Sequence, residues 1–372
     1  RTYALYNPAH PDELVGHAAL SSVGDVDAAV RAAHAAYPAW SATSYAERAE
    51  KLNDVADYLE AGQDDVDQRA RLFCREHGKP IKETYLEVSR LGDRFRSTAA
   101  YADRLARDEN EHGQPFDTII TRQPRGVATL IVPWNWPLSI LGAKLPQALM
   151  AGNTVVVKPS ELSTLAPSMT LQRIAEMFPP GVINIVTGDA TKIGDNLVGH
   201  PLVRFVNFTG STRIGKHVMK VAADQLTPVT LELGGNDPAI VCADARLDEK
   251  AFMNMYLGAF MSSGQICMAL KRLYVHRSRY NEVIEGLSAV CNQMVVGDGL
   301  LPDTNMGPVN NAKQLKTVTD MIGQARASGA EVRECGRVLD EALYRNGYFQ
   351  KPALVFNPDQ NLDIVAEEQF GP

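Results

Sequence analysis

Apolar residues recur every three or four positions between residues 26 and 76, a spacing that predicts two amphipathic helices. Pro38 and the segment "SATS" are expected to separate them, and a serine or threonine of that segment can cap the second helix. A further helix is predicted over "KETYLEVSRLGDRFRSTAAYADRLA". The polar stretch "RDENEHGQPFD" is then expected to break the pattern, and "TIITRQPRG" has the composition of a strand followed by a turn.

The pattern changes after residue 126. Short apolar runs such as "VATLIV", "TVVVKP" and "VRFVNFTG" alternate with helical stretches such as "SILGAKLPQALMAG" and "STRIGKHVMKVAADQ". This alternation predicts a parallel sheet with helices on both faces. A second series begins at "PAIVCADA", with helices expected around 249–262, 278–293 and 311–329. We therefore predict two α/β domains, with a boundary near Gly234–Asp237.

Composition adds limits rather than detail. The 372 residues are 45% hydrophobic and 22% charged, as in ordinary globular proteins, and the net charge of −7 does not favour a nucleic acid or an anionic membrane as a partner. The first residues show no signal-peptide pattern, so we expect a cytoplasmic protein. The five cysteines are widely spaced without a C-x-x-C pair, which argues against a disulfide framework and against a metal site.

Two segments could bind a nucleotide. In "VNFTGSTRIGK" a strand, a glycine turn and a helix opened by Ser211 follow one another, although Gly210 and Gly215 do not form the G-x-G-x-x-G pattern. The helix N-terminus suits a phosphate, or the segment is simply a capped strand–helix turn. In "TVVVKPSEL", Lys158 and Glu161 follow a strand and could hold ribose hydroxyls, or they could be a solvated strand end.

Three further residues could carry chemistry. Asn135, between two tryptophans and two prolines in "VPWNWPLSI", is either an oxyanion donor or a structural turn residue. Glu232, in the apolar strand "TLELGG", is either a paired structural carboxylate or a proton-transfer group with a raised pKa. Cys267 follows "SGQI", and the helix expected after it could lower the pKa of its thiol.

Taken in order, "PWNWPL", "AGNTVVVKPSE", "FTGSTRIG", "LELGG", "SGQIC" and "EEQFGP" resemble the motifs of the aldehyde dehydrogenase superfamily. The resemblance covers essentially the whole chain. It implies an aldehyde dehydrogenase-like α/β fold, with a Rossmann-type cofactor domain at 1–112 and 126–234, an oligomerisation arm at 113–125 and a catalytic domain at 235–372. It also implies that family members continue beyond the position of Pro372, so we expect a truncated catalytic domain.

The resemblance assigns roles to four catalytic positions. Cys267 matches the nucleophile that attacks the aldehyde and later carries a thioester. Asn135 matches the oxyanion donor, and Glu232 matches the general base that activates water. Lys144, expected on the helix after Asn135, matches a supporting lysine.

The resemblance also implies a cofactor site for NAD, with NADP as a further candidate. A carboxylate at Glu161 should repel a 2′-phosphate, which favours NAD. The expected cofactor-binding residues are Trp134, Lys158, Ser160, Glu161, Gly210, Ser211, Gly234, Glu368 and Phe370.

In the family, the helix after Asn135 lines the substrate tunnel. Trp136, Ile140 and Ala143 are spaced to share one face of that helix, and Met268 flanks Cys267. These residues favour an apolar, bulky or aromatic aldehyde, unless they only pack the core.

We therefore expect an NAD(P)-dependent aldehyde dehydrogenase that binds a small-molecule aldehyde and forms a homodimer or homotetramer. A non-catalytic nucleotide-binding or structural relative is the first alternative, and the early end of the catalytic domain favours it. A coenzyme-A-acylating relative is the second, and Glu232 argues against it because such relatives usually lack this glutamate.

Overall fold

The computed structural model describes residues 1–111 and 113–372, which form two compact units. Unit 1 comprises Arg1–Tyr3, His17–Ala70 and Tyr85–Glu232, and unit 2 comprises Ala4–Gly16, Arg71–Thr84 and Leu233–Pro372. The chain thus leaves unit 1 after Glu232. The sequence analysis placed all of residues 1–112 in the cofactor domain, whereas Ala4–Gly16 and Arg71–Thr84 belong to unit 2 in the structure.

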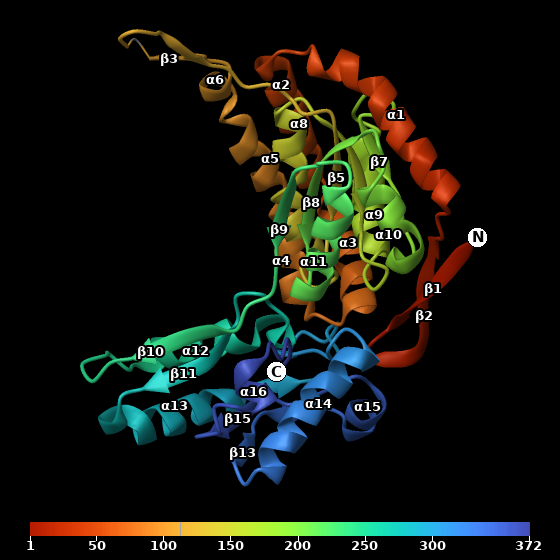
Figure 1. Ribbon diagram of the computed structural model, residues 1–372. Helices are drawn as coiled ribbons and strands as arrows, with labels where there is room; N and C mark the ends of the chain where they lie inside the picture. Colours follow the sequence, from red (N-terminus) through yellow and green to blue (C-terminus); the bar gives the residue numbers. More distant parts are fainter. Residues whose placement is uncertain (112) are drawn as a thin grey trace. The chain divides into compact units, whose positions relative to one another are not determined.

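Unit 1 contains the parallel five-stranded sheet that the alternating pattern predicted (Figure 1). Its strands are β5 (Val127–Ile131), β6 (Thr154–Lys158), β7 (Ile183–Ile185), β8 (Val203–Thr209) and β9 (Val229–Glu232), in the order β7-β6-β5-β8-β9. Ile131 pairs with Lys158 on one side and with Phe208 on the other. The carboxyl ends of these strands therefore meet at one edge of the sheet.

Helices connect and cover these strands. The connecting helices are α7 (Pro137–Gly142), α8 (Leu145–Met150), α9 (Leu165–Ala175), α10 (Ala190–Val198) and α11 (Thr212–Ala223). Helix α1 (Val23–Ser41) packs against β5, β6, β7 and α10, while α2 (Tyr45–Glu60) packs against α5 (Leu91–Ala99) and α8. Strand β6 is buried along its whole length, which explains its continuous apolar run.

The first helices differ from the prediction in where they break. Helix α1 continues through Pro38 to Ser41 instead of ending there. Pro38 removes the N–H that would bond the carbonyl of His34, but both residues lie on the exposed side of the helix, where water can satisfy that oxygen. Ser44 caps α2 as predicted, because its hydroxyl accepts a hydrogen bond from the Glu47 N–H.

The long helix expected after residue 81 is three helices, so that prediction was wrong. They are α4 (Ile81–Ser89), α5 and α6 (Ala102–Leu105), and they follow α3 (Gln63–His77). The polar stretch expected to break the pattern contains a strand, β3 (Glu109–Glu111), which pairs antiparallel with β4 (Thr118–Ile120). His112, in the same stretch, lies outside the described residues.

Unit 2 carries three small sheets in its C-terminal part. They are β10 (Asp237–Val241) with β11 (Leu270–Val275), β12 (Val295–Val296) with β14 (Arg337–Val338), and β13 (Glu331–Glu334) with β15 (Ala353–Phe356). The first two pairs are parallel and the third is antiparallel. The expected second α/β series is therefore present as separate strand pairs in the described chain.

Helices surround these strand pairs. They are α12 (Glu249–Phe260), α13 (Tyr280–Gln293), α14 (Ala312–Ala327), α15 (Glu341–Asn346), α16 (Asp363–Ala366) and the short 3-10 helices η1 (Met261–Gly264) and η2 (Arg277–Arg279). The three long helices were predicted close to these bounds. Tyr256, Phe260, Cys291 and Met306 lie in the buried core of this unit.

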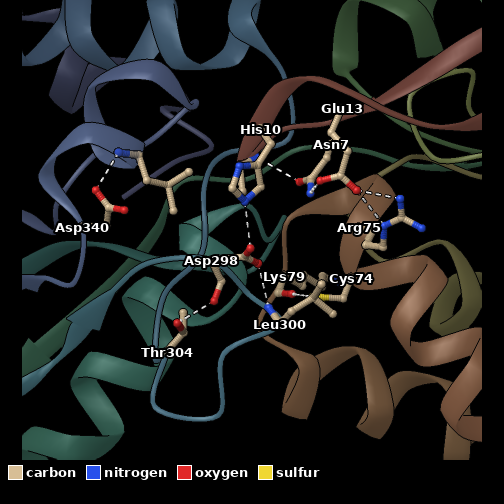
Figure 2. Close-up of polar contacts among 12 residues, drawn as sticks. Asn7, His10, Glu13, Cys74, Arg75, Lys79, Asp298, Leu300, Thr304 and Asp340 are labelled. Atoms are coloured by element: carbon tan, nitrogen blue, oxygen red, sulfur yellow. Dashed lines mark hydrogen bonds and ion pairs between the residues drawn. The ribbon is translucent and has the colours of Figure 1, made fainter.

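The N-terminal part of unit 2 is held by polar contacts (Figure 2). It comes from the two-stranded sheet of β1 (Thr2–Asn7) and β2 (His10–Ala19). His10 Nε2 lies 2.9 Å from Asp298 Oδ2, and Arg75 Nη2 donates to Glu13 Oε1 at 2.6 Å.

No helix in the described residues is long and apolar enough to cross a membrane.

Candidate functional site

Asn135 lies in unit 1, in the short loop between β5 and α7, and its side chain is buried. Pro137 occupies the first position of α7, where no N–H is needed. The next two N–H groups, those of Leu138 and Ser139, both donate to Glu87 Oε1 at 2.9 Å. The buried Glu87 carboxylate thus fixes the start of α7 and with it the loop that carries Asn135.

Lys144 lies between α7 and α8, not on a continuous helix as expected. Its side chain is buried, and its ammonium donates to the amide oxygen of Asn207 on β8. Burial lowers the pKa of Lys144 to about 8, although the negative charge of Glu232 acts to raise it. Glu232 itself is the exposed last residue of β9 rather than an interior strand residue. The two groups therefore share the electrostatic environment of the carboxyl edge of the sheet.

The strand–turn–helix segment at Ser211 forms as predicted. Ser211 is the N-cap of α11, and its hydroxyl accepts a hydrogen bond from the Ile214 N–H. A side chain at Gly210 would collide with the Phe208 ring, so only glycine fits the turn. The first N–H groups of a helix have no partners within the helix, and they carry the positive end of its dipole. The start of α11 can therefore bind an anionic group.

Lys158 and Glu161 form a pair at the end of β6. Lys158 is buried, and its Nζ donates to Pro159 O at 3.3 Å and to Glu161 Oε2 at 3.4 Å. Burial lowers the pKa of Lys158, while the Glu161 carboxylate opposes this shift. Ser160 turns the chain by accepting a hydrogen bond from the Leu162 N–H. The segment thus presents a cation and a partly exposed carboxylate side by side.

Cys267 lies in unit 2, between η1 and β11. The helix expected after it is absent from this part of the described chain, because strand β11 begins at Leu270. That prediction was wrong, because the chain after Cys267 continues into a strand and not into a helix. Cys267 is not part of a disulfide, and its side chain is half-buried.

The turn before Cys267 has an unusual backbone. Ser262, Ser263 and Gly264 have φ angles of 54°, 55° and 70°, so three successive residues are left-handed. Such a conformation costs a non-glycine residue roughly 1–2 kcal/mol and persists only where surrounding contacts enforce it. The strained turn ends three residues before the nucleophile position.

Buried hydrogen bonds hold this turn. The Ser262 N–H donates to Glu83 Oε2 at 3.0 Å, and the Ser263 hydroxyl donates to Gly307 O at 2.8 Å. Gln265, fully buried, donates to Ser262 O and accepts a hydrogen bond from the Asn310 N–H. These contacts fix the backbone that leads to Cys267.

The glycine pair of "LELGG" packs against two other segments of unit 2. A Cβ at Gly235 would collide with the Cys267 carbonyl, and one at Gly234 would collide with the Glu368 carboxylate. The Gly235 N–H donates to Glu368 Oε1 at 3.1 Å. Burial raises the pKa of Glu368, although this hydrogen bond and Lys271 act in the opposite direction. Cys267 and Glu368 are thus brought to the same glycine pair.

The expected tunnel residues are divided between the two units. Trp136 and Ile140 are partly buried and Ala143 is exposed in unit 1, while Met268 is 74% exposed in unit 2. Unit 2 contains a cavity of about 840 Å³ lined by side chains of β11, α13 and β15, and none of these four residues lines it.

None of the other four cysteines is an expected catalytic residue: three are buried and Cys242 is exposed. Burial raises the pKa of Cys74, of Cys335 and, to about 12, of Cys291. A buried thiol with a raised pKa is a poor nucleophile. Cys242 is exposed, in the loop after β10.

Sequence reasoning missed the buried groups that hold the site. Glu83 and Glu87 lie four residues apart on α4, a spacing that usually indicates a solvated face. Their apolar neighbours Leu86 and Val88 were the only sequence signal for burial. Asn207, inside β8, gave no signal beyond a polar residue in an apolar strand.

The chain is similar to known proteins along its whole length. The profile of the aldehyde dehydrogenase family matches residues 1–372. The chain is 36% identical over 376 residues to 3-succinoylsemialdehyde-pyridine dehydrogenase of Pseudomonas sp, covering 100% of this chain and 76% of that protein.

Two solved structures extend the comparison to the fold. One is a point mutant of betaine aldehyde dehydrogenase from Staphylococcus aureus, in complex with NAD+ and with a BME-modified cysteine. It matches with a TM-score of 0.93 at 31% identity, and the match covers 100% of this chain and 74% of that chain. The other is an NADP dependent enzyme from E. coli, with a TM-score of 0.93 at 34% identity and coverage of 100% and 76%. With matches of sequence and fold along its whole length, the chain belongs to the aldehyde dehydrogenase family.

Proposed function

We propose that this aldehyde dehydrogenase oxidises apolar aldehydes to carboxylic acids through a thioester on Cys267. NAD(P)-dependent oxidation of aldehydes is the activity of the family. The observation that carries the assignment of the nucleophile is the turn before Cys267. This turn is strained, buried and hydrogen-bonded, and it leads to a partly exposed cysteine that is not in a disulfide. The relative with a BME-modified cysteine supports a reactive thiol in this family.

The first step is addition of the Cys267 thiolate to the aldehyde carbon. A C–S bond forms, and the carbonyl electron pair moves to oxygen. The Asn135 amide and the Cys267 N–H are the proposed donors to this oxyanion. An oxidised nicotinamide, when bound, would supply the hydride acceptor for the oxidation of this adduct to a thioester.

The second step is hydrolysis. Glu232 accepts a proton from water, and the hydroxide equivalent attacks the thioester carbon. The C–S bond then breaks, Cys267 leaves as a thiolate, and the carboxylic acid is released. The buried Lys144 ammonium holds Asn207 and provides positive charge close to Glu232.

The residues of unit 1 fit a dinucleotide. The cradle at Gly210 excludes a side chain, and the start of α11 behind Ser211 suits a pyrophosphate. Lys158, Ser160 and Glu161 would hold the adenosine ribose. Trp134, which directly precedes Asn135 in the sequence, is a further proposed cofactor contact. For the nicotinamide half, we assign Gly234, Glu368 and Phe370 in unit 2.

The Glu161 carboxylate favours NAD over NADP. It is the partly exposed member of the Lys158 pair, and it would meet a 2′-phosphate with like charge. The similarity to an NADP dependent enzyme keeps both cofactors in the proposal.

An apolar, bulky or aromatic aldehyde is the proposed substrate class. Trp136, Ile140, Ala143 and Met268 carry no charge, and Met268 is largely exposed beside the nucleophile. The relative named for a pyridine-bearing semialdehyde supports an aromatic group.

We also propose a cytoplasmic homodimer or homotetramer that assembles through the arm at 113–125. Phe116 and Ile119 of this arm are 79% and 65% exposed, which is unusual for large apolar side chains.

Parallel assays of Cys267→Ser and the unchanged chain test the reaction. Reduction of NAD and NADP is followed with aliphatic and aromatic aldehydes, and the product is identified as free acid or thioester. We expect aldehyde-dependent reduction, lost in the variant although NAD still binds, with the best kcat/KM for an apolar aldehyde. Cys242→Ser, which removes the other exposed thiol, is the matched control.

Full activity in Cys267→Ser would refute the nucleophile. A charged semialdehyde as the best substrate would refute the substrate class. A folded, NAD-binding chain that reduces no cofactor would favour the non-catalytic alternative, and release of a coenzyme A thioester would favour the acylating one.

A further inference from the structure

Lys271, the second residue of β11, has a role that the proposed reaction leaves unexplained. Its Nζ donates to Ala259 O, in the last turn of α12, at 3.1 Å. It also donates to Gly371 O at 2.6 Å. One side chain therefore ties the end of α12 to the segment that contains Glu368 and Phe370.

The same ammonium group packs against the turn that leads to Cys267. A Cβ at Gly264 would lie 2.6 Å from Lys271 Nζ and would collide with the Gly371 carbonyl. Gly264, Lys271 and Gly371 are thus in direct contact, with no space between them. A shift of one of these groups would therefore disturb its contacts with the other two.

Phe370 lies in a strained conformation between two clamped carbonyl groups. Its φ of 53° is left-handed, which disfavours a side chain as large as phenylalanine. On one side, Gln314 Nε2 donates to Gln369 O at 2.8 Å. On the other side, Lys271 holds Gly371 O. Strain of this kind persists only where the surroundings over-determine the backbone, and these two donors do so.

We propose that Lys271 is a positioning residue, which holds Glu368 and Phe370 in fixed register with the turn that carries Cys267. The proposal rests on the nicotinamide-side role assigned above to Glu368 and Phe370. Lys271 touches neither cofactor nor substrate in this role. It sets where the nicotinamide contacts lie relative to the nucleophile.

The charge of Lys271 matters for the strength of this clamp. Hydrogen bonds from a charged donor are roughly twice as strong as neutral ones. Burial lowers the pKa of Lys271 to about 8, while the Glu368 carboxylate acts in the opposite direction. The ammonium form prevails at neutral pH, and the clamp weakens as the pH rises above 8.

The first test does not depend on activity. Amide hydrogen exchange of the segment 365–371 is measured in the unchanged chain, in Lys271→Met and in Gln314→Ala. Each variant removes one clamp. In Lys271→Met we expect exchange there to become faster by about tenfold or more, as when a hydrogen bond of a charged group is lost, and in Gln314→Ala, which loses a neutral donor, by about two- to tenfold. Lys313→Met, an exposed lysine on α14, is the matched control and should change nothing. Unchanged exchange in Lys271→Met would overturn the proposal.

The second test separates positioning from general stability. In Lys271→Met we expect the KM for NAD to rise and kcat to fall, each by about tenfold, while iodoacetamide labels Cys267 at nearly the unchanged rate. We also expect the decline of kcat/KM for NAD above pH 8 to disappear in this variant. Lys271→Arg, which keeps a charged donor, should retain part of the NAD affinity. A lower Tm with unchanged kinetic constants and pH profile would show a merely structural role.

The two tests distinguish the failure of each proposal. If the unchanged chain oxidises no aldehyde, the proposed function fails, and the exchange experiment still decides whether Lys271 holds the Phe370 segment. If aldehydes are oxidised and Lys271→Met behaves as the unchanged chain in both tests, only the role of Lys271 fails.

Discussion

At the scale of single residues, Lys144 combines burial, a hydrogen bond to Asn207 and the influence of Glu232. Burial of the ammonium group disfavours its charged form, and the nearby Glu232 carboxylate offsets only part of this effect. The folded state therefore releases the proton of Lys144 at a pH where the unfolded chain still holds it.

This difference predicts how stability depends on pH. The pKa of Lys144 is about 8 in the folded state and 10.5 for an ordinary lysine, so between these values the unfolded state binds more protons. The free energy of unfolding of the unchanged chain should then rise with pH relative to Lys144→Met, by at most about 3 kcal/mol at ~1.4 kcal/mol per pH unit. Denaturant titrations of both proteins at pH 7.5, 9 and 10.5 measure it, with Lys313→Met as an exposed control. A difference that stays constant with pH would contradict the burial of this charge.

The sequence predicts where motif residues lie along the strands, but it does not predict the backbone conformation and contacts around them. The positions of Asn135, Lys158 and Ser211 at strand ends follow from the alternating pattern, because that pattern fixes where each strand stops. The conformation around Cys267 does not follow from it. "MSSGQIC" has no periodicity, and its left-handed turn depends on Glu83, which is distant in the sequence.

At the scale of elements, the left-handed turn at Ser262–Gly264 has a conformational cost. Ser262 and Ser263 adopt a backbone that glycine would accept without penalty. The Ser262 hydroxyl is buried and has no hydrogen-bond partner among the described residues. Its side chain therefore contributes strain and brings no compensating bond.

Replacement of Ser262 measures this strain. Ser262→Gly and Ser262→Ala both remove the hydroxyl, but only glycine relaxes the positive φ, so the glycine variant should be more stable by about 1 kcal/mol. Urea unfolding of the two variants gives the difference directly. If the alanine variant were equally stable, the backbone at this position would not be strained as described.

The elements themselves were predicted with uneven success for a physical reason. The strands of unit 1 appear in the sequence as continuous apolar runs, because a strand such as β6 is buried along its whole length. Helices α12, α13 and α14 show a helical period instead, since each presents one apolar surface to a core. The breaks between α4, α5 and α6 are invisible in that signal, because the apolar positions continue across them. Pro38 gave a false break because a proline near an exposed helix end removes one hydrogen bond that water replaces.

At the scale of the whole molecule, the arm at 113–125, which contains β4, exposes large apolar side chains. Ile119 is 65% exposed in the middle of β4, and its neighbour Thr118 points to the other face of the strand. An apolar strand of this kind is a surface for association with a second chain.

A charge on this surface should weaken assembly. Ile119→Asp is expected to shift the protein to a smaller oligomer at micromolar concentration, because association would bury an unpaired carboxylate. Thr118→Asp adds the same charge to the opposite face and should assemble as the unchanged chain does. Light scattering after size exclusion reports the mass of each. Equal masses for all three proteins would exclude the arm as the contact.

Unit 2 is assembled from three separated stretches of the chain, and this has a consequence during synthesis. His10 is made early, but its partner Asp298 emerges only after 288 further positions, which takes roughly 15–60 s at ~5–20 residues per second. Unit 1 ends at Glu232, so its sheet is complete well before that moment. The N-terminal stretch of unit 2 therefore lacks its late partner until after the sheet of unit 1 is complete, and early exposure to chaperones or proteases falls mainly on this stretch.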